Sequence, residues 1–135
     1  MRADSFLDTN ILLYASSRTE AEQEKRNVAR GLLSRDGVGL SVQVLAEFYV
    51  NAVSKFKLPE DGVMAVLAKL ASYPILPLDE SVFWAALEIR KRHGVSYWDG
   101  AIIAAAVELG CHTVFSEDLN HGQVYAGVTV VNPFL

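Results

Sequence analysis

The chain has 135 residues, of which 51% are hydrophobic, and its formal net charge is −4. This length and composition are those of a folded protein with one hydrophobic core, so we expect residues 1–135 to form a single domain. The acidic balance argues against a broad basic surface that holds nucleic acid by counterion release alone. The single cysteine, Cys111, excludes a disulfide framework and a cysteine-based zinc site.

The first residues of the chain contain no signal-peptide pattern. A short apolar run ends at Asp8, and no later apolar run approaches the roughly 20 residues that a membrane-spanning helix needs. We therefore expect a cytoplasmic protein that does not bind to a membrane.

Short apolar segments alternate with helical patterns along the chain. Strands are expected at residues 5–7, 38–40, 75–78, 112–115 and 128–131. Helices are expected at residues 11–15, 20–34, 41–55, 59–72, 79–93 and 96–109. Strands that alternate with helices form a parallel sheet covered on both faces. The sequence therefore predicts an α/β fold, a three-layer α/β/α domain with a parallel sheet of four or five short strands.

The segment from Ser96 to Leu109 predicts a helix that runs through the middle of the molecule. No charged residue lies between Asp99 and Glu108, and a helix that is apolar on nearly every side is a buried helix. Ser96 and Asp99 have the spacing of a capping box, in which Asp99 would only cap the helix. The alternative is that a firmly anchored helix holds the Asp99 carboxylate at the floor of a functional site.

Four acidic residues are candidates for a shared site. Asp8 and Asp118 each follow a predicted strand, and Asp99 begins the buried helix. Glu47 lies on the helix after the second strand, off its apolar stripe and in line with Gln43. Taken singly, each acid could be a helix cap, a loop residue or a solvated helix residue. Because ligands of parallel α/β sheets bind beyond the carboxyl ends of the strands, all four can meet at one place.

Carboxylates gathered in this way need protons or cations. Two unit charges about 4 Å apart repel by roughly 4 kcal/mol at an effective dielectric constant of about 20. Oxygen ligands without histidine or cysteine favour hard ions such as Mg²⁺ or Mn²⁺, and Mg²⁺ often completes its shell with phosphate oxygens. The chemistry that follows is phosphodiester cleavage, in which a metal ion activates the attacking water and stabilises the leaving oxygen.

Four segments together resemble the PIN-domain ribonucleases, and more narrowly the VapC-type toxins of toxin–antitoxin pairs. These segments are Phe6–Ala15, Glu47 on its helix, Ser96–Asp99 with the alanine-rich helix that follows, and Ser116–Leu119. The resemblance covers nearly the whole chain, including the ending Val131–Phe134. One departure is Gly100, where alanine is commoner in the family. A glycine in the first turn costs on the order of 1 kcal/mol but leaves the acids intact.

The resemblance implies a PIN-like domain that acts as an endoribonuclease, depends on Mg²⁺ or Mn²⁺ and hydrolyses phosphodiester bonds in RNA. The acidic catalytic cluster that it implies is Asp8, Glu47, Asp99 and Asp118. The metal ligands are expected among Asp8, Asp99 and Asp118. The supporting residues, which orient the site through hydroxyl or amide groups, are Thr9, Asn10 and Ser116. The resemblance also implies a homodimer and a cognate antitoxin that occludes the site.

Several questions stay open at this point. Either Glu117 or Asp118 could face the metal, and we expect Asp118. The helices predicted at 20–34 and 59–72 have mixed apolar and charged faces, which favours a groove between them for a helix of the antitoxin. One alternative function is a non-catalytic PIN-like binding module. Another is an aspartyl-phosphate phosphatase with Asp8 as nucleophile, although Asn10 stands where haloacid-dehalogenase-like enzymes have a second aspartate.

The remaining polar and aromatic residues allow weaker predictions. Basic residues end two predicted helices, at Arg90–His93 and at Lys55 and Lys57, where they could complement the helix dipole or contact RNA phosphates. The three histidines are not spaced as ligands on one helix face, so we expect no metal or general-base role for them. Trp84, Trp98 and the phenylalanines fall on apolar stripes and are expected in the core.

Overall fold

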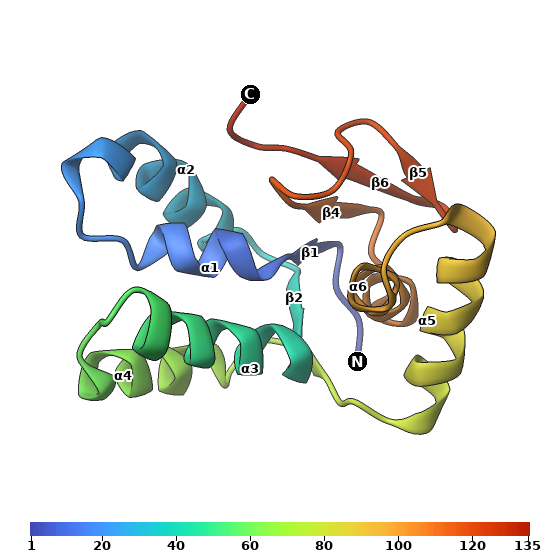
Figure 1. Cartoon of the computed structure of the whole chain (residues 1–135), viewed down its shortest axis with the longest axis horizontal. Coiled ribbons are helices and arrows are strands. Elements are labelled where there is room, and N and C mark those ends of the chain that lie inside the picture. Colours follow the sequence, from blue (N-terminus) through green and yellow to red (C-terminus); the bar gives the residue numbers. More distant parts are fainter.

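A six-stranded sheet crosses the middle of the molecule (Figure 1). The structure is a computed structural model that describes all residues from 1 to 135. The strands are β1 (Ser5–Leu7), β2 (Val38–Ser41), β3 (Ile75–Leu76), β4 (Thr113–Phe115), β5 (Val124–Tyr125) and β6 (Val128–Val131). Their order in the sheet is β3-β2-β1-β4-β6-β5, and all neighbours are parallel except β5 and β6. The five parallel strands are those predicted, and only the antiparallel β5 was missed.

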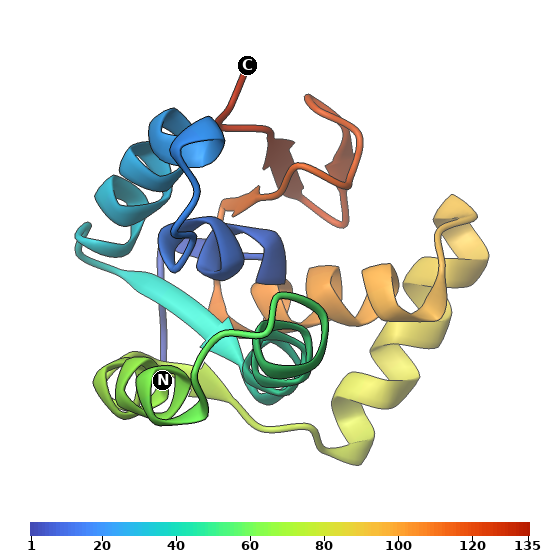
Figure 2. The same ribbon diagram turned by 60° about the vertical axis from the view of Figure 1, so that its left-hand side comes forward.

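The helices cover both faces of this sheet. They are α1 (Thr9–Ala15), α2 (Gln23–Leu33), α3 (Val42–Val50), α4 (Glu60–Leu70), α5 (Glu80–His93) and α6 (Tyr97–Leu109). A short 3₁₀ turn, η1 (Glu20–Glu22), precedes α2, and a π-helical turn, η2 (Asn51–Lys55), follows α3. Helices α1 to α4 lie on one side of β1 and β2, whereas α6 and α5 lie on the other (Figures 1 and 2). The predicted three-layer α/β/α fold is confirmed. None of these helices has the length and apolar character needed to span a bilayer.

Helix α6 is the buried helix that the sequence predicted. Every residue from Gly100 to Ala106 is buried, and the helix lies between the sheet and α5. The structure also gives a reason for Gly100, because a Cβ atom there would lie 2.7 Å from the carbonyl oxygen of Ala86 in α5. Glycine therefore permits the close approach of the two helices.

Side chains and glycines cap the ends of α5 and α6, including Ser96, the cap that the sequence predicted. Ser96 accepts a hydrogen bond from the backbone N–H of Asp99 at 3.0 Å, and Asp79 accepts one from Val82 at the start of α5. Gly94 ends α5 in the left-handed conformation, with a φ of 70°. These signals are local in sequence, and they mark where each helix begins and ends.

The prediction that the large aromatic residues all lie in the core is wrong for several of them. Trp84 is 56% exposed, Trp98 is 60% exposed, and Phe56 and Phe83 are also exposed. Phe83 and Trp84 lie on α5, an outer helix that buries only one face. Trp98 lies in the first turn of α6, before the buried stretch that begins at Gly100, and Phe56 ends η2. Phe83, Trp84, Tyr97 and Trp98 instead stack on one another through edge-on and tilted ring contacts. We call these four residues the aromatic patch.

Candidate active site

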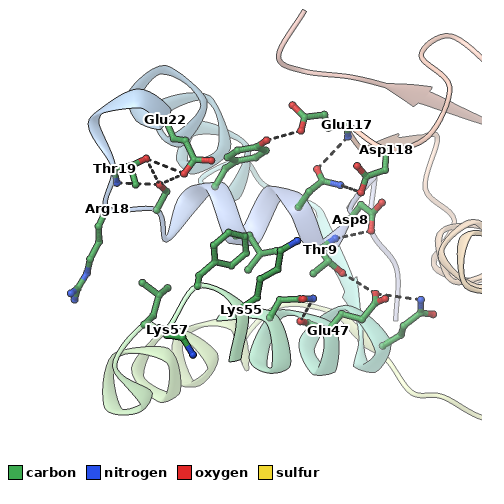
Figure 3. Close-up of a pocket in the computed structure, with 18 of the residues that line it drawn as sticks. Asp8, Thr9, Arg18, Thr19, Glu22, Glu47, Lys55, Lys57, Glu117 and Asp118 are labelled. Atoms are coloured by element: carbon green, nitrogen blue, oxygen red, sulfur yellow. Dashed lines mark hydrogen bonds between the residues drawn. The ribbon is translucent and has the colours of Figure 1, made fainter. Parts of the chain in front are cut away.

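A cleft of about 630 Å³ opens beside α1, α3 and the first turn of α6, at the carboxyl ends of the parallel strands. The four acidic residues that the sequence singled out all line this cleft. They are Asp8, Glu47, Asp99 and Asp118. Figure 3 shows Asp8, Glu47 and Asp118 at the same end of it. The fold therefore brings together carboxylates from four separate segments of the chain.

Asp8 is the most deeply buried of these acids, with 6% of its surface exposed. It caps α1, and its Oδ1 accepts a hydrogen bond from the backbone N–H of Thr9 at 2.7 Å. Burial raises the pKa of Asp8 to about 6, and the negative charges of Asp118 and Glu47 raise it as well, against the opposing effect of its hydrogen bonds. The carboxyl group therefore tends to keep its proton unless a cation offsets the negative charge of its ionised form.

Ser116 connects Asp8 to the loop after β4. Its buried Oγ donates to Oδ2 of Asp8 at 2.8 Å. The same oxygen accepts hydrogen bonds from the backbone N–H groups of Asp118 at 3.1 Å and of Leu119 at 3.3 Å. One hydroxyl therefore orients the carboxylate of Asp8 and also fixes the turn that carries Asp118.

Asn10 and Glu117 determine how this loop faces the cleft. The side-chain amide of Asn10 donates to Oδ2 of Asp118 at 3.2 Å, and its oxygen accepts from the backbone N–H of Glu117 at 3.2 Å. The Glu117 carboxylate accepts hydrogen bonds from the Tyr14 hydroxyl and from the Lys25 ammonium group, each at 2.6 Å. Partial burial acts to raise the pKa of Glu117, but these two bonds together lower it. Glu117 is engaged with α1 and α2, and Asp118 is the acid whose charge acts on Asp8.

Glu47 is held from three sides. The Thr9 hydroxyl donates to its Oε1 at 3.0 Å, and the Gln43 amide donates to the same oxygen at 3.4 Å. Asn51 donates to the Glu47 backbone carbonyl at 2.8 Å. The Gln43 amide also donates to the carbonyl of Trp98 at 3.2 Å, which joins α3 to the start of α6. The sequence placed Gln43 on the same face as Glu47 but gave no sign of this bridging contact.

Gln43 also has an unsatisfied acceptor. The residue is 4% exposed, and its buried Oε1 has no hydrogen-bond partner. A buried carbonyl oxygen without a partner is unfavourable.

Asp99 lies in the first turn of α6 and is half-buried. Its backbone N–H is capped by Ser96, but its carboxylate accepts no hydrogen bond, so the reciprocal half of the capping box is not formed. The carboxylate is therefore free to contact a ligand in the cleft that it lines.

The donor set suits a hard divalent cation, since it consists of carboxylate and amide oxygens without sulfur or imidazole. None of the three histidines lines the cleft. In the present side-chain positions, no three acidic, histidine or cysteine residues are close enough to one another to hold a metal ion. The residues fit such an ion in kind, and binding it would require side chains to move toward Asp8.

Taken together, these observations describe an α/β protein with a cleft lined by carboxylates at the carboxyl ends of its parallel strands. The PIN domain family model matches residues 5–127. The chain therefore belongs to the PIN domain family, as the sequence motifs implied.

The chain is also similar to several solved structures. A toxin–antitoxin complex from Klebsiella pneumoniae has a TM-score of 0.72 and 18% identity, over 96% of this chain and 98% of that one. VapC20 of Mycobacterium tuberculosis, a toxin that cleaves the sarcin–ricin loop, has a TM-score of 0.66 and 21% identity, over 85% of this chain and 92% of that one. FitAB bound to a DNA fragment has a TM-score of 0.73 and 27% identity, over 97% of this chain and 96% of that one. No curated protein sequence matches the chain.

Proposed function

We propose that this protein is an endoribonuclease that depends on Mg²⁺ or Mn²⁺ and is the toxin of a toxin–antitoxin pair. The observation that carries the proposal is the buried Asp8, which shares its cleft with Glu47, Asp99 and Asp118. Its pKa is raised to about 6, mainly by burial. A further support is that the similar VapC20 is a toxin that cleaves an RNA loop. Because the proposed substrate is cellular RNA, the proposal includes a cytoplasmic location.

In this proposal, Asp8, Asp99 and Asp118 hold the metal and Glu47 completes the acidic catalytic cluster. When bound, the divalent cation lowers the pKa of the attacking water and stabilises the charge on the leaving oxygen. The contacts of Thr9, Asn10 and Ser116 keep the carboxylates of Glu47, Asp118 and Asp8 in place. The supporting residues therefore act by positioning, which preserves the geometry that an in-line displacement requires.

The test is RNA cleavage by purified protein with Mg²⁺, with Mn²⁺ and with EDTA. Asp99→Asn should abolish cleavage, whereas Asp61→Asn, at an exposed acid outside the cleft, should leave it unchanged. Circular dichroism of both variants controls for folding. Cleavage retained by a clean preparation of Asp99→Asn would refute the assignment.

A second measurement separates the nuclease from a non-catalytic binding module. A ligand that binds only the folded state raises the melting temperature. We expect Mn²⁺ to raise the melting temperature of the wild type but not that of Asp99→Asn. A binding module that uses its acids only as helix caps would show no metal-dependent change.

We also propose that an antitoxin helix binds between α2 and α4. A smaller cavity of about 210 Å³ lies there, lined by Arg30 of α2 and by Gly62, Val63 and Val66 of α4. The similar structures include a toxin–antitoxin complex. Pull-down with the product of the adjacent reading frame tests the proposal. Val66→Lys should weaken capture, and capture unchanged by this variant would place the antitoxin elsewhere.

The proposed homodimer has a candidate surface in the aromatic patch. Trp84 and Trp98 are more than half exposed, and such a group of large exposed aromatic side chains is typical of a protein interface. We expect a dimer by light scattering and a monomer for Trp84→Glu. A wild-type monomer at micromolar concentration would contradict the homodimer.

A further inference from the structure

The cleft that holds the carboxylates is electrically polarised. Arg18, Lys55 and Lys57 line the same cleft as the acids. Figure 3 shows Arg18 and Lys57 at the end opposite Asp8, with Lys55 between the two ends. Glu22 lies at the same end, where its carboxylate accepts hydrogen bonds from the hydroxyls of Ser17 and Thr19. The only salt bridge in the structure joins Lys25 and Glu117, so none of the three cations forms a salt bridge with Glu22 or with another acid. In a chain with a net charge of −4, three cations to one acid is a local excess of positive charge.

The backbone that presents two of these cations has an unusual conformation. After α3, the chain continues into the π-helical turn η2, in which the N–H of Phe56 donates to the carbonyl of Asn51 at 3.0 Å. Lys57 follows with a φ of 52°, the left-handed conformation that glycine usually takes after a helix. π-helical turns and left-handed residues other than glycine are uncommon and are often found at functional sites.

Phe56 lies between the two lysines and also lines the cleft. Its side chain is 49% exposed, and the Lys55 ammonium group lies 5.6 Å from its ring centroid. A helix dipole explains cations at a helix end, but it does not explain an exposed aromatic ring between them. An aromatic face beside free cations is the combination that binds single-stranded nucleic acid, because bases stack on the ring and phosphates contact the cations.

We propose that Arg18, Lys55, Phe56 and Lys57 form a subsite for single-stranded RNA next to the carboxylates. The scissile phosphate lies at the acidic end of the cleft, phosphates of adjacent nucleotides contact the three cations, and one unpaired base stacks on Phe56. A base within a duplex has no free face for this contact, so the subsite selects single strands. The inference rests on the proposed nuclease function and adds the residues that hold the strand and its direction along the cleft.

The experiment measures binding of a fluorescein-labelled oligouridine of about 12 nucleotides by fluorescence anisotropy, with EDTA present so that the strand stays intact. Each phosphate contact to a single strand contributes about 0.7 to the slope of log Kd against log salt concentration. Lys55→Gln and Lys57→Asn should each reduce this slope by about 0.7. Lys69→Gln, which removes an exposed lysine of α4 outside the cleft, is the matched control and should leave the slope unchanged.

The stacking contact is tested at Phe56. Phe56→Leu keeps an apolar side chain but removes the aromatic face, and it should raise Kd for oligouridine by about 5- to 20-fold, the lower part of the range for base stacking. Phe56→Tyr keeps the ring and should restore wild-type affinity. Equal binding by wild type, leucine and tyrosine variants would overturn the stacking assignment.

Cleavage kinetics separate failure of this inference from failure of the proposed function. We expect Lys55→Gln and Phe56→Leu to raise KM for single-stranded RNA with little change in kcat. If the wild type cleaves RNA and neither variant changes KM, the subsite is refuted while the nuclease stands. If these variants instead lose antitoxin binding with KM unchanged, this end of the cleft belongs to the protein partner. If the wild type neither binds nor cleaves RNA, the proposed function itself is wrong.

Discussion

Replacement of Asp8 by asparagine should stabilise the metal-free protein at neutral pH. Burial, together with the charges of Asp118 and Glu47, raises the pKa of Asp8 from 3.8 to about 6. A shift of about two pKa units corresponds to roughly 3 kcal/mol of unfavourable free energy for the ionised form in the folded state. The side chain of the Asp8→Asn variant carries no charge, so this penalty would be absent at every pH.

The sign of the effect depends on pH. Because the folded state of the wild type keeps the Asp8 proton to higher pH than the unfolded state, the contribution of Asp8 to stability is highest below pH 4 and falls as the pH rises to about 6. Asparagine also accepts through one oxygen only, whereas Asp8 accepts from both Thr9 and Ser116, so about 1 kcal/mol of hydrogen bonding is lost. We expect Asp8→Asn to be about 2 kcal/mol more stable than the wild type at pH 8 and slightly less stable at pH 4.

The assay is urea unfolding in EDTA at several pH values between 4 and 8. Other groups titrate in both proteins, so the difference between the two unfolding free energies isolates Asp8. Asp36→Asn, at an exposed turn, is the control and should follow the wild type across the whole range. A difference between Asp8→Asn and wild type that is the same at pH 4 and at pH 8 would refute the reasoning.

Three further predictions concern packing, hydrogen bonding and thiol chemistry. In thermal unfolding, Gly100→Ala should lower the free energy of unfolding by about 1–3 kcal/mol, because the added Cβ meets a carbonyl of α5. Gly31→Ala, at an open helix position, should raise it by about 0.5–1 kcal/mol. Ser116→Ala should lower the free energy of unfolding by about 1–3 kcal/mol and raise the pKa of Asp8 further. The decrease of stability with rising pH should then extend to a higher pH than in the wild type. Burial raises the pKa of Cys111 to about 11, so a disulfide reagent at pH 8 should label this thiol only in urea.

The parts of the structure that the sequence predicted are those with a local cause. Helix α6 was recognisable because its residues lack charge, and its start was recognisable because Ser96 has the capping pattern. Glu47 was placed beside Gln43 because residues four apart share a helix face, and their side chains are hydrogen-bonded in the structure. The meeting of Asp8 with Asp118 followed from a general property of parallel sheets rather than from any local signal.

The parts that sequence reasoning missed depend on contacts between distant residues. The hydrogen bonds of Glu117 join it to Tyr14 and Lys25, which lie 103 and 92 residues away in the chain. Trp98 is exposed in the first turn of α6, before the buried stretch that begins at Gly100, and an apolar stripe does not reveal where that burial begins. Arg18 follows α1 in a stretch without a motif, and only the cleft shows that it shares a surface with Lys57.

The register of the sheet explains why the carboxylate cluster forms where it does. Strands β1 and β4 are parallel with Leu7 opposite Phe115, and the N–H of Asp8 donates to the carbonyl of Phe115 at 3.0 Å. The next residue on each strand, Asp8 and Ser116, must then emerge side by side, which permits their 2.8 Å hydrogen bond. A slip of one residue would turn each side chain of β1 to the opposite face and bury the wrong set. The apolar pattern that buries these two short strands therefore also aligns Asp8, which lines the cleft, with Ser116.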